Sequence, residues 1–160
     1  MSESARILVI DDEERIRRTI SMTLEHAGYS VDTAENGKQA IQKTEASFYN
    51  LALIDVRLPD MEGTELLTTL KETTPRMIKI ILTGYPQLQN AVKAINKGVD
   101  YYLVKPVNPT ELLRVIKEQL DKQKREKEYG QEKLAQFVEA RLHEVEAQEA
   151  ETPKAEIPKM

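Results

Sequence analysis

The sequence contains no cysteine and only two histidines among its 160 residues. Without cysteine there can be no disulfide scaffold, thiol nucleophile, zinc–thiolate site or iron–sulfur cluster. The two histidines, His26 and His143, lie far apart in the sequence and leave little for a histidine-rich metal site. These absences indicate a protein of a reducing compartment whose chemistry depends on other side chains.

Long apolar segments are also missing. No stretch is long and apolar enough to cross a bilayer, and the first ten residues, MSESARILVI, lack the basic region and apolar run of a signal peptide. The net charge is −4, whereas broad nucleic-acid binding draws its affinity from a basic surface. We therefore expect a soluble cytoplasmic protein that neither inserts into a membrane nor binds nucleic acid.

The composition of the chain changes near Lys117. Between Lys117 and Met160 nearly half of the residues are charged, whereas most of the hydrophobic residues precede Lys117. This shift predicts one globular domain over residues 1–120 and a charged helical tail over residues 121–151. The proline-containing residues 152–160 have the composition of a disordered segment.

The globular part alternates between two apolar patterns. Short continuous apolar runs, such as Ile7–Ile10 and Leu51–Ile54, are typical of strands buried on both faces. Between the runs, apolar residues recur at helical spacing, and Gly28 follows the first such segment. We expect strands at residues 7–10, 29–33, 51–54, 77–82 and 101–104. Five strand–helix units predict an α/β fold, a doubly wound parallel sheet with helices on both faces.

Polar residues follow four of the expected strands. Asp11 and Asp12 follow the first, Asp55 the third, Thr83 ends the fourth, and Lys105 follows the fifth. Ligands of such sheets bind at the carboxyl ends of the strands. Three carboxylates gathered there repel one another and need a cation, and hard oxygen ligands suit Mg²⁺. A carboxylate beside bound Mg²⁺, with a lysine and a hydroxyl nearby, can act as a nucleophile toward phosphorus.

Four motifs in order along the chain are ILVIDDE, LALIDVRLPDMEG, IILTGY and YYLVKP. This series resembles the receiver (CheY-like) domain of two-component response regulators over about residues 5–120. The resemblance implies a flavodoxin-like sheet of strand order 2-1-3-4-5 flanked by five helices. It also implies that Asp55 is the phosphoacceptor and that Asp11, Asp12, Asp55 and the backbone carbonyl of Arg57 hold Mg²⁺.

The same resemblance assigns roles to three further residues. Thr83 matches the switch hydroxyl that bonds the phosphoryl group, Lys105 matches the lysine of the site, and Tyr102 matches an aromatic that turns inward on activation. The peptide bond between Lys105 and Pro106 is expected to be cis, which proline makes tolerable.

These residues also have simpler explanations. Asp11 and Asp12 could be an ordinary helix N-cap with a favourable charge at the helix dipole, and Tyr102 could be a packing residue alone. A flavodoxin-like FMN binder shares the topology, but no glycine- or hydroxyl-rich phosphate loop follows the first strand. Two acids there would repel a phosphate that lacks a metal.

The resemblance implies a stand-alone response regulator that takes a phosphoryl group from a sensor histidine kinase. Its output is expected on the face formed by the fourth helix, fifth strand and fifth helix, toward an unknown protein target. Such a domain is not an enzyme in the metabolic sense, since it catalyses only its own phosphorylation and slow dephosphorylation. The alternative is a receiver fragment of a longer transcription regulator or hybrid kinase, with the tail as a linker.

The tail carries one apolar stripe. The stripe allows two interpretations. The first is a solvated extension of the last helix that frays beyond Gly130. The second is a surface that packs on a partner or on a second copy in a homodimer through the last helix or tail. A sustained heptad is absent. The residues of the stripe are Leu134, Phe137, Val138, Leu142 and Val145.

Overall fold

The computed structural model describes residues 4–151, so the segment 152–160 that we predict to be disordered lies outside the described residues. The elements are β1 (Arg6–Ile10), α1 (Glu14–His26), β2 (Ser30–Ala34), α2 (Gly37–Ala46), β3 (Leu51–Ile54), α3 (Gly63–Thr69), β4 (Ile78–Thr83), α4 (Leu88–Asn96), β5 (Tyr101–Val104) and α5 (Pro109–Glu151). The strands form one parallel sheet in the order β2-β1-β3-β4-β5. This confirms the predicted α/β fold.

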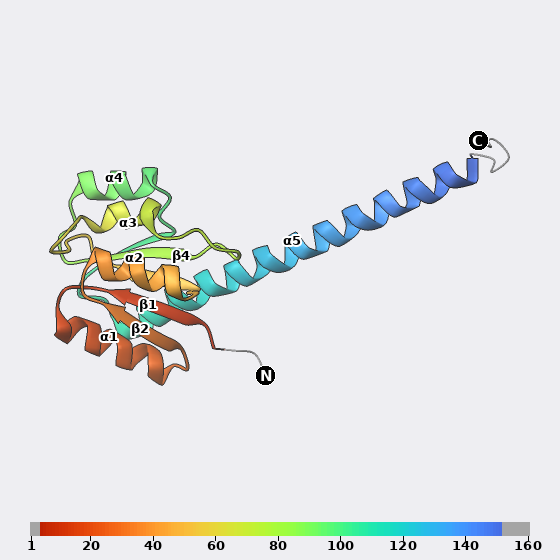
Figure 1. Cartoon of the computed structure of the whole chain (residues 1–160). Coiled ribbons are helices and arrows are strands. Elements are labelled where there is room, and N and C mark those ends of the chain that lie inside the picture. The colour runs from red at the N-terminus through yellow and green to blue at the C-terminus, as the bar shows by residue number, and fades with distance from the viewer. Residues whose placement is uncertain (1–3, 152–160) are drawn as a thin grey trace. The chain divides into compact units, whose positions relative to one another are not determined.

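Successive side chains of each strand point to opposite faces of the sheet, which divides the core in two. In β1, Ile7 and Val9 join the cluster under α1 and the start of α5. Leu8 and Ile10 join the cluster under α2, α3 and α4, which lie together on the other face (Figure 1). Because both faces are covered, the inner strands are apolar at nearly every position, which explains the continuous runs in the sequence.

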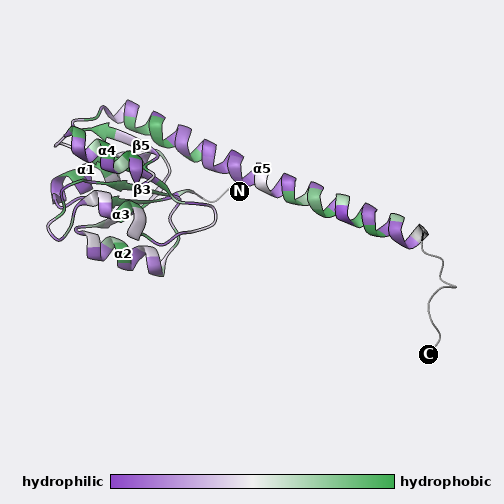
Figure 2. Cartoon of the chain, turned by 90° about the horizontal axis from the view of Figure 1, so that it is seen from above, coloured by the Kyte–Doolittle hydropathy of each residue, from purple (hydrophilic) through white to green (hydrophobic). Residues whose placement is uncertain are grey.

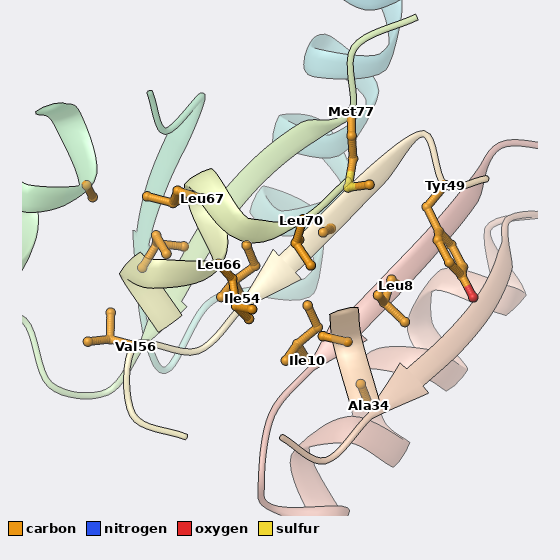
Figure 3. Packing of buried hydrophobic residues seen from close by; sticks show 14 residues of the cluster. Leu8, Ile10, Ala34, Tyr49, Ile54, Val56, Leu66, Leu67, Leu70 and Met77 are labelled. Carbon is orange, nitrogen blue, oxygen red and sulfur yellow. The ribbon is translucent and has the colours of Figure 1, made fainter. Parts of the chain in front are cut away.

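The cluster beneath α2, α3 and α4 positions the end of β3. Leu66, Leu67 and Leu70, from α3 and its C-cap, pack with Ile54 of β3 and Leu8 of β1 (Figure 3). All five side chains are almost completely buried, and each stabilises the fold by about 1.5–3 kcal/mol through its loss of contact with water. This packing fixes α3 against the sheet next to the loop that follows β3.

One charged side chain interrupts this apolar face. Lys79, in the middle of β4, is 5% exposed, and its Nζ donates a 2.7 Å hydrogen bond to the backbone carbonyl of Leu67. That carbonyl lies in the last turn of α3, where helical carbonyls lack partners within the helix. Burial lowers the pKa of Lys79, against the smaller opposing effect of Glu72. The side chain of Lys79 therefore satisfies a backbone carbonyl at the C-terminal end of α3.

Two helix ends and one cis peptide bond lie where we expected them from the sequence. Gly28 and Gly98 have φ angles of 100° and 86°, and each follows a helix that we expected to end there. The peptide bond between Lys105 and Pro106 is cis, as the resemblance implied. The bond between Thr74 and Pro75 is also cis, which we did not predict.

The contacts of the chain divide it into two units between Gln123 and Lys124. The first unit holds the sheet and the first part of α5. Gln123 is buried, and its side-chain amide donates to the backbone carbonyls of Asn50 (3.0 Å) and Arg76 (2.7 Å). These bonds fasten α5 to the segments that lead into β3 and β4. Our boundary at residue 120 stays a prediction.

The second unit is the remainder of α5, and all five residues of the predicted apolar stripe are exposed there. Apolar and polar bands alternate along it (Figure 2). The helix does not end at Gly130, contrary to the fraying that a solvated extension suggested. One glycine costs a helix about 1 kcal/mol, which the surrounding lysine, glutamate, glutamine and alanine residues offset. Within the described residues, no helix has the length and apolarity needed to cross a membrane.

Candidate functional site

Three carboxylates meet at the carboxyl ends of β1 and β3. These strands pair in parallel, with Ile10 opposite Ile54, so the residues that follow them are neighbours. One oxygen from each of Asp11, Asp12 and Asp55 lies within 4.8 Å of the others. Asp11 and Asp55 are buried, whereas Asp12 is exposed. The structure thus brings together the three acids that the sequence predicted.

Lys105 supplies the positive charge of this cluster. It follows β5, and its backbone N–H donates to the carbonyl of Thr83 at 2.8 Å, which continues the pairing of β5 with β4. Its Nζ donates to a carboxylate oxygen of Asp11 and, at 3.4 Å, to one of Asp55. The ammonium therefore bridges the two buried acids and offsets part of their repulsion.

The charges of the site shift one another's pKa values. Burial raises the pKa of Asp55, and the nearby carboxylate of Asp11 raises it further, while Lys105 and the backbone N–H of Arg57 act against them. Burial alone would lower the pKa of Lys105, but the hydrogen bonds to Asp11 and Asp55 and the charges of these two carboxylates outweigh burial and raise it. The site thus holds an excess of negative charge that favours a bound cation.

The donor set fits a hard divalent cation. Three carboxylate oxygens within 4.8 Å of one another are the kind of ligand that Mg²⁺ takes, usually one or two carboxylates together with water and phosphate oxygens. Exposed Asp12 leaves the cluster open to solvent on one side. The residues present therefore fit Mg²⁺, and Asp11, Asp12 and Asp55 are those that could hold it.

Gly63 allows α3 to begin against the backbone of Asp55. Its N–H donates to the carbonyl of Val56 at 2.6 Å. A Cβ at this position would lie 1.8 Å from the carbonyl oxygen of Asp55, which is backbone and cannot move aside cheaply. Only glycine fits this approach, and the glycine is the last residue of the motif LALIDVRLPDMEG.

The loop between β3 and α3 also holds the start of α2. The two carboxylate oxygens of Asp60 accept hydrogen bonds of 2.9 Å from the backbone N–H groups of Gly37 and Lys38. These bonds satisfy donors that a helix leaves unpaired at its first turn, and the Gly37 bond is the main reason that the pKa of Asp60 is lowered. The loop that follows Asp55 is thereby tied to a second helix.

Arg57 and Tyr85 form a pair beside the carboxylates. The backbone N–H of Arg57 donates to Asp55 Oδ1 at 3.4 Å, and its guanidinium carbon lies 4.1 Å from the centre of the Tyr85 ring. Both side chains are exposed, and such a stack contributes about 0.5–1 kcal/mol. We did not single out Tyr85 in the sequence. It could have been found from its position two residues after Thr83, in the loop that follows β4, the strand next to β3.

Thr83 and Tyr102 lie on the neighbouring strands β4 and β5. Thr83 is fully buried, and its Oγ1 accepts a 3.0 Å hydrogen bond from the N–H of Tyr85. Tyr102 is partly buried and packs against the cluster under α4. Its hydroxyl is buried without a hydrogen-bond partner in the described part of the chain, and burial raises its pKa. Leaving a buried hydroxyl unpaired costs free energy.

Comparisons with known proteins agree with this geometry. The family model of the response regulator receiver domain matches residues 7–117. Transcriptional regulatory protein ResD of Bacillus subtilis (strain 168) is 39% identical over 116 residues, which cover 72% of this chain and 48% of ResD. A solved CheY-like receiver domain protein from Methanospirillum hungatei JF-1 has 47% identity and a TM-score of 0.74, covering 77% of this chain and 98% of that one.

A third similar structure is a response regulator from Burkholderia pseudomallei with a phosphorylated aspartic acid, a calcium ion and citrate. It is 29% identical with a TM-score of 0.65, and the match covers 77% of this chain and 72% of that one. This chain spans about half the length of ResD. Receiver domains are signalling domains rather than classical enzymes. The chain belongs to the family of response regulator receiver domains.

Proposed function

We propose that Asp55 accepts a phosphoryl group with the help of Mg²⁺ bound by Asp11, Asp12, Asp55 and the backbone carbonyl of Arg57. The observation that carries this proposal is the cluster of three carboxylates within 4.8 Å, two of which are bridged by Lys105. A role at the helix N-terminus alone would explain Asp11 and Asp12. It would not explain Asp55, a buried acid that follows a neighbouring strand and shares Lys105 with Asp11.

The donor is the phosphohistidine of a sensor histidine kinase. A carboxylate oxygen of Asp55 attacks the phosphorus, the P–O bond forms as the P–N bond breaks, and the electron pair stays on the imidazole of the kinase. Bound Mg²⁺ supplies positive charge toward the phosphoryl oxygens. Lys105, already 3.4 Å from Asp55, stays charged and binds an oxygen of the transferred group. Water later hydrolyses the acyl phosphate slowly, so the chemistry is limited to the domain itself.

The output follows from Thr83 and Tyr102. A phosphoryl oxygen on Asp55 accepts a hydrogen bond from the Thr83 hydroxyl, which moves toward the site and leaves space for Tyr102. The phosphorylated form thus favours one of two arrangements, as a population shift requires. The surface that changes is the face of α4, β5 and α5. Its exposed apolar residues include Leu88, Val92, Ile95 and Val104.

The partners of this output are proteins. A downstream target docks on the face of α4, β5 and α5, and the exposed stripe of the tail pairs with that target or with a second copy of the chain. The negative net charge disfavours nucleic acid as a ligand of this span, and the location we propose is the cytoplasm, without membrane insertion. A second candidate is a receiver segment of a longer transcription regulator or hybrid kinase, which the half-length match to ResD favours.

Mass spectrometry of the intact protein tests the chemistry. Incubation with acetyl phosphate and Mg²⁺ should add one phosphoryl group to the wild-type protein and none to Asp55→Asn. Asp12→Ala should need more Mg²⁺ for the same extent of labelling, because one carboxylate ligand is lost. Full labelling of Asp55→Asn would show that another residue is the acceptor.

A further inference from the structure

Arg17, on α1, connects two loops next to the acidic cluster. Its Nη1 donates a 2.7 Å hydrogen bond to the backbone carbonyl of Asp11, and its Nη2 lies 3.7 Å from Oε1 of Glu35. The side chain is 11% exposed. Asp11 follows β1 and Glu35 follows β2, so one guanidinium joins the loops at the carboxyl ends of two adjacent strands.

The position of Arg17 is unfavourable for the helix itself. A positive charge near a helix N-terminus opposes the helix dipole, and burying a guanidinium costs free energy unless its donors are paired. The next residue, Arg18, is 69% exposed and pairs with Glu14 within the helix. The largely buried position of Arg17 is therefore explained by the loops that it holds rather than by the stability of α1.

The contacts of Asp11 show what is held. Its backbone N–H donates to the carbonyl of Ala34 at 3.1 Å, and its own carbonyl accepts from Arg17. Its side-chain Oδ1 accepts a 2.9 Å bond from the N–H of Glu13. The backbone N–H, the backbone carbonyl and one carboxylate oxygen of Asp11 are thereby fixed. Asp12 is the next residue, so its position depends on the same turn of the backbone.

We propose that Arg17 is a positioning residue for the Mg²⁺ site. By holding the carbonyl of Asp11 against the loop of Glu35, it aims the carboxylates of Asp11 and Asp12 before the ion binds. Partners that orient metal ligands in this way typically account for 10–100-fold in metal affinity. This inference rests on the proposed function, since it concerns the same metal.

Calorimetric titration of the metal-free protein with Mg²⁺ tests this role. Arg17→Gln should bind Mg²⁺ about tenfold more weakly than wild type. Arg18→Gln is the matched control: it removes the neighbouring exposed arginine and should change the affinity less than about twofold. Arg17→Lys should lie between them, since one ammonium can reach the Asp11 carbonyl but cannot hold both loops as a guanidinium does.

Two measurements separate positioning from a general loss of structure. With acetyl phosphate as donor, Arg17→Gln should need more Mg²⁺ for half-maximal labelling yet reach the wild-type rate at saturation. A partly unfolded protein would instead lose part of the maximal rate. In EDTA, the amide proton of Glu13, which is bonded to Asp11, should exchange faster in Arg17→Gln than in Arg18→Gln.

Each outcome decides between the two proposals. Wild-type Mg²⁺ affinity in Arg17→Gln, together with lost binding in Asp55→Asn, would overturn the role of Arg17 and leave the proposed function standing. Absence of Mg²⁺ binding in the wild-type protein would overturn the proposed function itself. If circular dichroism shows that Arg17→Gln is unfolded, Arg17→Lys decides, and wild-type affinity in that variant would refute the inference.

Discussion

Replacing Asp55 with asparagine should stabilise the metal-free protein. Asp55 and Asp11 have oxygens no more than 4.8 Å apart, which gives a repulsion of at least about 3.5 kcal/mol at an effective dielectric constant of about 20. Lys105, 3.4 Å from Asp55, gives an attraction of about 5 kcal/mol on the same scale. Exposed Asp12 adds a screened repulsion, so the charge terms nearly cancel and burial decides.

Asparagine keeps the shape of the side chain and removes the buried charge, while Lys105 keeps its bond to Asp11. We therefore expect Asp55→Asn to raise the free energy of unfolding by about 1–2 kcal/mol in EDTA at neutral pH. In excess Mg²⁺ the wild-type protein should gain stability, because the ion binds the folded state, and Asp55→Asn should gain much less.

The pH dependence has a defined direction. The pKa of Asp55 is raised from its ordinary value of 3.8 in the folded protein, so the folded state holds this proton more tightly than the unfolded state. The contribution of Asp55 to the stability of the wild type therefore falls as the pH rises from 3.8 through the folded-state pKa. The advantage of Asp55→Asn should be small at acid pH and complete above that window.

Urea unfolding followed by circular dichroism measures these differences. Asp60→Asn is the matched control, because that carboxylate accepts two backbone hydrogen bonds and its pKa is lowered. Loss of its charge should destabilise the protein, the opposite sign to Asp55→Asn. If Asp55→Asn is no more stable than wild type in EDTA at neutral pH, the assumed cost of burying this charge is wrong.

Three further predictions concern other parts of the molecule. Arg57→Ala should lose its acyl phosphate faster, because a side chain of this length, stacked on Tyr85 in the structure, can swing over the phosphorylated Asp55; an equal or slower rate refutes shielding. Gly63→Ala should lose about 2–3 kcal/mol in urea unfolding, since its Cβ meets backbone at 1.8 Å, whereas Gly130→Ala, with open space around it, should not destabilise. The oligomeric state measured by light scattering, with and without beryllofluoride, should be higher for the full chain than for a version ending at Gln123; if neither beryllofluoride nor the tail alters it, self-association is not the output.

The sequence predicted the sheet and its acidic cluster well because both depend on local patterns. Leu51–Ile54 and Tyr101–Val104 are short apolar runs, and the structure gives strands with these same bounds. Once five parallel strands are expected, the residues after them must meet at one edge. Asp11 and Asp55 could therefore be placed together without knowledge of a single long-range contact.

The features that the sequence did not reveal depend on partners far along the chain. Lys79 lies within an apolar run, and its role depends on a carbonyl of α3. Arg17 reads as one of several charges on α1 until its bond to Asp11 is known. The continuation of α5 through Gly130 depends on neighbouring residues whose summed helix propensity outweighs the cost of one glycine. Gly130 considered alone therefore predicts fraying that does not occur.

The buried side chain of Lys79 provides a natural chemical probe of how often α3 separates from β4. Acylating reagents modify exposed lysines quickly. Lys79 is 5% exposed and its amine is bonded to Leu67, so it should react only when α3 moves away from β4. The fraction of Lys79 modified over time, read by peptide mass spectrometry, therefore measures how often this part of the domain opens. Since α3 begins against the backbone of Asp55, the same labelling rate compares the domain before and after phosphorylation without any introduced probe.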